Sequence, residues 1–254
     1  MMNLFKMDLH RFLTNKIMYI LLVVFIAFQI FGIFMIKQYE QPVEQGGMLI
    51  SHMNESQFIQ QMLAQTPSWV LIYVTVFSVY FYMSEYNAGF YKNYISMKRA
   101  RMYSVLSKIV ILGLFTLLMM LVMVVADLIG RAIFFQQATL GALGYLSTLL
   151  AGQFLLHWAF SIVILSLTMI LKSMLTSIVT GIILALNVFG MAVGALESLF
   201  TDLNVSAYLL VNTIVRIKDF NQLSDVIHVF SVAIAFILLF SCIAIRYKMK
   251  EDLK

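Results

Sequence analysis

The lysines and arginines of this 254-residue chain lie mostly in short breaks between long apolar runs, and they gather on every second break. The six apolar runs are residues 17–36, 68–83, 109–126, 142–171, 174–195 and 226–245. A helix rises about 1.5 Å per residue, so about 20 apolar residues cross a hydrocarbon layer roughly 30 Å thick. The pattern therefore predicts an all-α polytopic membrane protein with six transmembrane helices.

The distribution of basic residues also predicts the orientation. Six crossings return the chain to its starting side, and that side carries most of the 17 basic residues. These are Lys6, Arg11, Lys16, Lys92, Lys98, Arg99, Arg101, Lys108, Lys172, Arg246, Lys248, Lys250 and Lys254. Because basic loops stay in the cytoplasm, we expect both termini to be cytoplasmic.

The composition limits the classes of function. With 62% hydrophobic and 11% charged residues, most of the chain faces lipid or other helices. The net charge of +5 is explained by topology, so it does not indicate nucleic-acid binding. Cys242 is the single cysteine and lies in the last run, which excludes a disulfide or a cysteine metal site within one copy.

Two segments outside the runs are also predicted to be helical. Residues 1–16 place their apolar side chains at helical spacing, which indicates an interfacial helix leading into the first span. Residues 196–225 are too short to cross and too apolar for an ordinary loop. They predict a pair of half-buried external helices or, alternatively, an incidental amphipathic surface helix. Neither segment is a separate domain, so residues 1–254 form a single transmembrane domain.

Residues 84–108, between the second and third runs, are basic and aromatic. Glu85 lies at the exit of the second run and Gly89 follows four residues later. Lys92-Asn93, a turn rich in Lys and Arg, and Ser107-Lys108 complete the segment. An ordinary basic loop that obeys the topology rule is one explanation.

The spacing within this segment resembles the cytoplasmic segment of ABC-2 (type V) exporter permeases, and the layout of the whole chain is similar to theirs. The chain looks most like the small bacterial peptide-exporter permeases, including the phenol-soluble modulin transporter and lantibiotic immunity types. It departs from the family by lacking the proline often found in the turn, here residues 96–99. The resemblance implies a multi-pass protein of the bacterial plasma membrane.

The resemblance further implies that residues 84–108 form a coupling helix that docks on a separate ATPase subunit. The residues implied in this contact are Glu85, Gly89, Lys92, Asn93, Tyr94, Ile95, Lys98, Arg99 and Arg101. The residues themselves support a separate ATPase, because the chain has no Gly-Lys-Ser or Gly-Lys-Thr step and hence no P-loop. ATP and Mg²⁺ would then be bound by the partner.

Several polar residues fall within the runs. Asp127 and Arg131 are four residues apart on one helix face, which predicts an ion pair near the outer end of the third span. His157 has no acidic or histidine partner nearby in the sequence, so a packed or cavity-lining histidine is favoured over a metal ligand. No proline lies inside the runs, so proline kinks are not expected.

By resemblance, the first and fifth spans border a pathway between two permease copies. The candidate pathway or dimer-interface residues are Gln29, Asn187, Gly190 and Gly194. Gly190 and Gly194 form a GxxxG step, which permits close helix approach but also occurs by chance.

The sequence therefore predicts the permease subunit of an ATP-driven exporter, not an enzyme in itself. It has no HExxH motif and no paired acids in a span, so no catalytic residues and no metal site are assigned. The predicted partners are ABC ATPase subunits, a second identical or related permease, the lipid bilayer and an amphipathic or antimicrobial peptide cargo. The alternatives are a non-transporting membrane immunity or sensor protein, or an ABC exporter of lipids or drugs.

Overall fold

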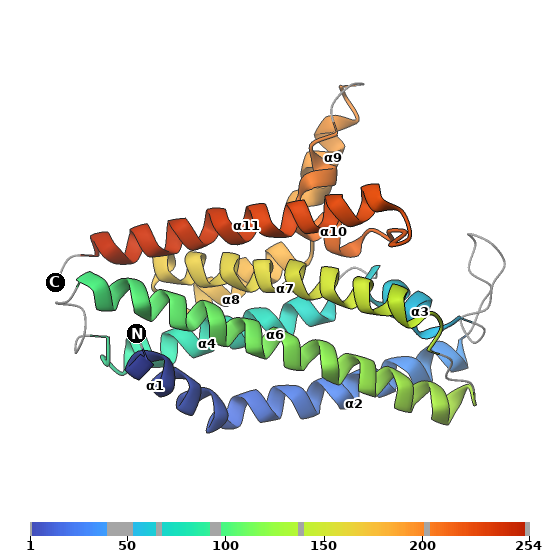
Figure 1. The fold of residues 1–254 in the computed structure, drawn as a ribbon, viewed down its shortest axis with the longest axis horizontal. Coiled ribbons are helices and arrows are strands. Elements are labelled where there is room, and N and C mark those ends of the chain that lie inside the picture. The colour runs from blue at the N-terminus through green and yellow to red at the C-terminus, as the bar shows by residue number, and fades with distance from the viewer. Residues whose placement is uncertain are drawn as a thin grey trace.

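In the computed structural model, the described residues are helical apart from turns and connections, with no strand among them. The structure describes residues 2–39, 53–64, 68–91, 98–136, 140–200 and 204–251. Its helices, shown in Figure 1, are α1 (Met2–Leu13), α2 (Lys16–Gln38), α3 (Glu55–Ala64), α4 (Trp69–Asn87), α6 (Lys98–Phe134), α7 (Leu143–Leu171), α8 (Met174–Ala185), α9 (Val188–Glu197), the short 3₁₀ helix η2 (Ser206–Tyr208), α10 (Leu210–Val215) and α11 (Leu223–Lys250). The predicted all-helical fold is confirmed.

Four helices are long and apolar enough to cross a membrane by themselves: α2, α6, α7 and α11. Two bent pairs, α3 with α4 and α8 with α9, also qualify if each pair counts as one span. The structure thus has four to six candidate spans, and each of the six apolar runs falls on one of these helices or bent pairs.

Local capping explains where two of the spans begin. The Asn15 side chain accepts hydrogen bonds from the backbone N–H groups of Ile17 and Met18 at 2.9 and 3.3 Å, which separates α1 from α2. Lys172 adopts the left-handed conformation, with a φ of 51°, and ends α7. Ser173 then caps α8 through the N–H of Thr176. The result is a tight turn between α7 and α8.

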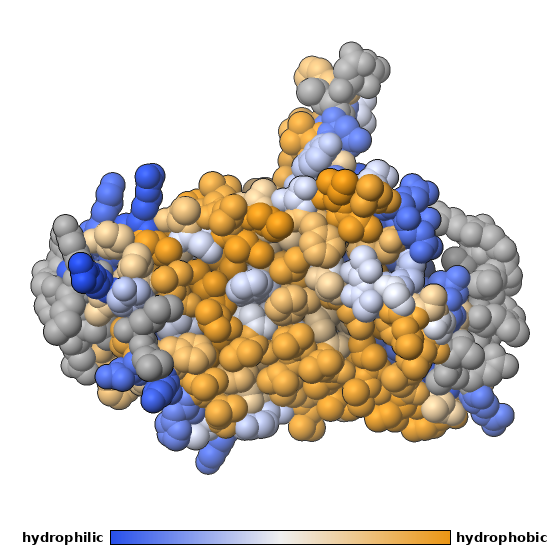
Figure 2. All heavy atoms as spheres, in the orientation of Figure 1, coloured by the Kyte–Doolittle hydropathy of each residue, from blue (hydrophilic) through white to orange (hydrophobic). Residues whose placement is uncertain are grey.

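The packing places α7 at the centre of the bundle. It lies against α4, α6, α8 and α11, and most of its side chains are buried. In contrast, α2 and α11 lie mostly at the surface. Only 22% of the most apolar 18-residue stretch of α2 is buried, and only 17% of that of α11. Figure 2 shows the result on one face of the bundle as a broad apolar belt, with hydrophilic groups near its two ends. Such a surface is stable when lipid covers the belt.

The helix α8 packs through small residues. Its buried side chains, Ser177, Gly181 and Ala185, recur every four residues and form one stripe. A Cβ atom at Gly181 would overlap the side chain of Thr75 on α4, so only glycine permits this approach. Small residues at this spacing allow helices to associate closely inside a membrane.

Beyond α8 the chain changes direction. The axes of α8 and α9 differ by 45°, and Figure 1 shows α9 standing away from the bundle. The short helices η2 and α10 then return to the bundle, where α10 packs against α7 and α11. Both α9 and these short helices fall in or next to residues 196–225, for which the sequence predicts external half-helices.

Both termini lie at the same end of the bundle, together with the end of α4 and the start of α6 (Figure 1). Arg101 of α6 donates hydrogen bonds to the carbonyl oxygens of Met249 at 3.2 Å and Glu251 at 2.8 Å. These contacts fix the end of α11 beside the start of α6. This end of the bundle is called the terminal end below.

Candidate functional site

The predicted coupling segment connects α4 to α6 at the terminal end. Gly89 follows α4 with a φ of +72°, a left-handed conformation that glycine adopts without steric cost. Lys98 is the first residue of α6, Arg99 is exposed, and Arg101 holds the end of α11 as described above. The remaining predicted coupling residues lie outside the described residues; they are Lys92, Asn93, Tyr94 and Ile95.

Glu85 belongs to a group of four charged side chains, which we call the coupling cluster: Asp8, Arg11, Glu85 and Lys108. Lys108 of α6 lies 2.9 Å from Glu85 of α4 and 3.5 Å from Asp8 of α1. Arg11 of α1 pairs with Asp8 at 3.1 Å and with Glu85. Two acids thus face two bases, and Asp8, Glu85 and Lys108 are each at most 2% exposed.

Arg11 also fixes α1 to the backbone of α4. Its second guanidinium nitrogen donates to the carbonyl oxygen of Phe81 at 3.2 Å and to the hydroxyl of Ser84 at 3.1 Å. The guanidinium carbon lies 4.9 Å from the centre of the Phe81 ring, within range of a cation–π interaction. The helix α1 is therefore held to α4 by directional polar contacts as well as by apolar packing, such as that of Phe12 against Phe77.

A second group of charges, the C-terminal cluster, joins α11 to the turn after α7. Glu251 accepts from Lys172 at 2.8 Å and from Lys248 at 2.6 Å. Burial by itself would raise the pKa of the Glu251 carboxyl, but the two lysine contacts outweigh it and lower that pKa below its usual value. The hydrogen bond to Glu251 in turn raises the pKa of Lys172. Each partner therefore stabilises the charged form of the other.

Aromatic rings connect the end of α4 with the C-terminal cluster. Tyr82, Tyr86 and Tyr91 form a stack, with ring centres 6.1 and 4.9 Å apart. The ammonium group of Lys248 lies 5.9 Å from the Tyr82 ring and 5.2 Å from the Tyr91 ring. The start of the predicted coupling segment is thus packed against the last turns of α11.

At the opposite end of α6, four polar side chains form a group that we call the distal cluster: Gln29, Glu55, Asp127 and Arg131. The amide nitrogen of Gln29 donates to Asp127 Oδ1 at 2.7 Å. Arg131 pairs with Glu55 at 2.7 Å, donates to the carbonyl oxygen of Met53, and lies over the Phe58 ring. All four side chains are buried, and the cluster joins α2, α3 and α6.

The predicted ion pair between Asp127 and Arg131 is therefore replaced by contacts with other helices. Both side chains lie on the face of α6 that meets α2 and α3, as the i, i+4 spacing predicts. There, Asp127 accepts a hydrogen bond from Gln29 of α2, and Arg131 pairs with Glu55 of α3. The sequence rule identifies a shared face, but it cannot anticipate partners contributed by distant segments.

Two of the predicted pathway residues, Asn187 and Gly190, meet at the break between α8 and α9. Asn187 has a φ of +58°, and its amide donates to Asn212 Oδ1 on α10 at 2.6 Å. Asn212 donates in turn to the carbonyl oxygen of Ser206 at 2.8 Å. A Cβ atom at Gly190 would overlap both asparagine side chains, so glycine is required there. Gly194 has open space around it, and Gln29 belongs to the distal cluster.

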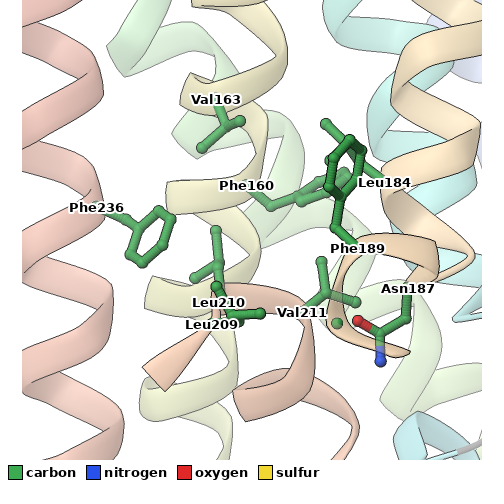
Figure 3. A pocket seen from close by; sticks show the side chains of 10 residues that line it. Phe160, Val163, Leu184, Asn187, Phe189, Leu209, Leu210, Val211 and Phe236 are labelled. Atoms are coloured by element: carbon green, nitrogen blue, oxygen red, sulfur yellow. The ribbon is translucent and has the colours of Figure 1, made fainter. Parts of the chain in front are cut away.

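A pocket of about 110 Å³ lies beside this break (Figure 3). Its walls come from α7, α8, α9, α10 and α11, and they are apolar except for the side chain of Asn187. Rings of Phe160, Phe189 and Phe236 contribute to the walls. A site of this kind accepts an apolar group such as a hydrocarbon chain or an aromatic side chain.

His157 lies in the centre of the bundle and is fully buried, as expected for a packed histidine. Its Nδ1 atom is 2.7 Å from the carbonyl oxygen of Gln153, one turn earlier in α7. In the part of the chain that the structure describes, no three His, Cys, Asp or Glu side chains are grouped so that they could hold a metal ion.

Sequence reasoning missed Asp8, Lys108, Glu55 and Asn212 as members of these groups. Asp8 is an acid beside apolar positions of the predicted N-terminal helix, which is the available signal for it. The contacts that build the clusters span long stretches of chain, 74 residues for Arg11 with Glu85 and 98 for Gln29 with Asp127. Such separations leave no short motif. Comparisons with known proteins add no assignment, since no protein-family model and no curated protein matches this chain.

Proposed function

We propose that this protein is the transmembrane permease subunit of an ATP-driven ABC exporter, working with ABC ATPase subunits and a second permease copy. The single observation that best supports the proposal is the buried pair between Glu85 and Lys108. These two residues stand on the two sides of the predicted coupling segment. A subunit that moves this segment would act directly on the helices that carry them.

The coupling cluster makes such a movement difficult to absorb locally. Separating Glu85 from Lys108 would break a buried ion pair and leave Glu85 with Arg11 and Lys108 with Asp8. Breaking a buried pair from one side typically costs about 3–5 kcal/mol. Because Asp8 and Arg11 share the same contacts, α1, α4 and α6 would move together. This is the behaviour that a permease needs if energy is released on a separate subunit.

We further propose that the cargo is an amphipathic peptide. The pocket at the α8–α9 break is apolar and opens beside a helix that stands away from the bundle. An amphipathic helix carries apolar side chains along one face, and those side chains suit such a pocket. Lipids and drugs are the competing cargoes, and they are included in the test.

The test is reconstitution of the permease in vesicles with an ABC ATPase encoded beside it. We expect the two proteins to co-purify and expect amphipathic helical peptides to stimulate ATP hydrolysis and to be transported. Peptides of the same composition, scrambled so that their apolar side chains no longer share one helix face, should do neither. If only a lipid or a drug is active, the peptide assignment is wrong. If no ATPase associates, a non-transporting immunity or sensor role is favoured.

Substitutions in the coupling segment complete this test. Replacing Tyr94 and Ile95 with aspartate should abolish peptide-stimulated ATP hydrolysis while normal amounts of protein insert into the membrane. The matched control is Gln222→Glu, an exposed change at the other end of the bundle, where a negative charge suits the start of α11. Full stimulation in the double aspartate variant would show that the segment only helps to set the orientation of the protein in the membrane.

A further inference from the structure

The distal cluster has an unequal number of acids and bases. It contains two carboxyl groups, Asp127 and Glu55, and one guanidinium group, that of Arg131. Both carboxyl groups are 0% exposed and Arg131 is 1% exposed. Glu55 takes the guanidinium as its partner, so Asp127 is left with a neutral amide, that of Gln29.

The polar atoms of the distal cluster are also not fully hydrogen-bonded. Asp127 Oδ2, Glu55 Oε1 and Arg131 Nε are buried atoms without a hydrogen-bond partner. A carboxylate oxygen buried in this way is costly in a low-dielectric interior, whereas a protonated carboxyl group carries no charge there. The cluster therefore has a place for one more positive charge, at an oxygen atom that makes no hydrogen bond.

No other charged group in the described residues compensates Asp127. The charges that act on it are Glu55 of α3 and Arg131 of α6. Acidic and basic side chains on the remaining neighbours of α6 are either engaged elsewhere or, for Lys6, His10, Lys16, Arg246 and Lys250, exposed. On α7, His157 contacts the Gln153 carbonyl; on α11, Asp225 pairs with Lys218, His228 contacts the Ala207 carbonyl, and Lys248 pairs with Glu251; on α2, Lys37 lies over the Phe135 ring; α1 and α4 contribute the coupling cluster.

We propose that the distal cluster is a proton-binding site, with the proton carried on Asp127 Oδ2. Binding adds one proton from water to Asp127 and changes the charge of the cluster from −1 to 0. Gln29 continues to donate to Oδ1, so the protonated carboxyl group keeps its orientation. No other atom or electron is exchanged, and release returns the proton to water.

The proton would control how α3 is held. When Asp127 is neutral, Arg131 interacts with Glu55, and this pair fixes α3 to α6. When Asp127 is ionised, it competes for Arg131 from one turn away on the same helix. Loss of the proton thus weakens the contact between α3 and α6. The α3 helix becomes a proton-dependent element beside the end of the spans.

Infrared spectroscopy of the purified full-length protein in lipid nanodiscs tests the proposal. At neutral pH we expect a carbonyl band of a protonated carboxyl group that shifts in D₂O and disappears at high pH. Asp127→Asn should lose this band, while Asp225→Asn, a carboxyl removed from a pair outside the cluster, should keep it. Absence of the band in the unchanged protein at neutral pH would overturn the proposal.

Glu55→Gln separates proton binding from simple burial. With one acid left for Arg131, Asp127 should ionise, so the band should vanish at neutral pH although Asp127 is present. A carboxyl group that is protonated only because it is buried would keep its band in this variant. Persistence of the band in Glu55→Gln would therefore contradict the role assigned to the charge count. This variant also serves if Asp127→Asn fails to fold.

Discussion

Single residues determine the character of each end of the bundle. Lys108 makes the sharpest case, because a long cationic side chain that is 1% exposed ends between two acids from different helices. Its chain of methylene groups packs as an apolar side chain would, and only the ammonium group needs partners. Removing that group leaves Asp8 and Glu85 with Arg11 as their cation.

Lys108→Met should destabilise the protein by about 3–5 kcal/mol, the typical cost of breaking a buried pair from one side. The measurement is the denaturation midpoint in detergent, compared with that of the unchanged protein. Lys6→Met removes an exposed lysine from α1 and should shift the midpoint little. Equal effects of the two substitutions would show that the coupling cluster does not stabilise the fold.

Among the helices, the break between α8 and α9 is a feature that the sequence analysis does not anticipate. The fifth apolar run contains no proline, so no proline kink is expected there. The structure bends it by 45° at Asn187, whose left-handed conformation is stabilised by Asn212, 25 residues later. Asparagine adopts this conformation more readily than most residues, and that is the only local signal.

Gly190→Ala should destabilise this break by about 1–3 kcal/mol, because the added methyl group overlaps the paired side chains of Asn187 and Asn212. Gly194→Ala is the matched control, since the space around Gly194 is open and alanine favours a helix by up to about 1 kcal/mol. Thermal unfolding of the two variants gives the comparison. A clear loss of stability in Gly194→Ala would instead indicate that α9 contacts a second chain.

The positions of the long helices follow from the sequence, whereas the contacts between distant segments do not. Apolar runs of sufficient length are enough to place α2, α6, α7 and α11, because hydrocarbon requires every backbone group to bond within the helix. The shared face of Asp127 and Arg131 also follows from helix geometry. The partners do not, since Glu55 reaches Arg131 across 76 residues. Contacts of this range depend on how whole helices pack.

At the scale of the whole molecule, both termini lie at one end of a bundle with an apolar belt. The distribution of basic residues predicts that this end faces the cytoplasm. The orientation can be tested at residues that are exposed in the structure. Arg99 and Met249 lie at the terminal end, and Gln222 lies at the start of α11, at the other end.

Single cysteines should report two sides of the membrane. In a Cys242→Ala background, Arg99→Cys and Met249→Cys should react with a membrane-impermeant thiol reagent only from the cytoplasm. Gln222→Cys should react only from outside. The measurement compares labelling of intact cells with that of inside-out vesicles. Labelling of Arg99→Cys and Gln222→Cys from the same side would contradict the prediction that the two ends of the bundle lie on opposite sides of the membrane.

The length of α6 has a mechanical consequence. Its 37 residues extend for about 55 Å, well beyond a hydrocarbon layer roughly 30 Å thick. Lys108 and Arg131 lie about 35 Å apart on this one helix, each fixed to other helices by buried ion pairs. The helix can therefore transmit a movement from one of these ion pairs to the other. A tilt of about 5° around the midpoint of α6 would displace each end of the helix by roughly 2 Å, enough to break the ion pair between Arg131 and Glu55.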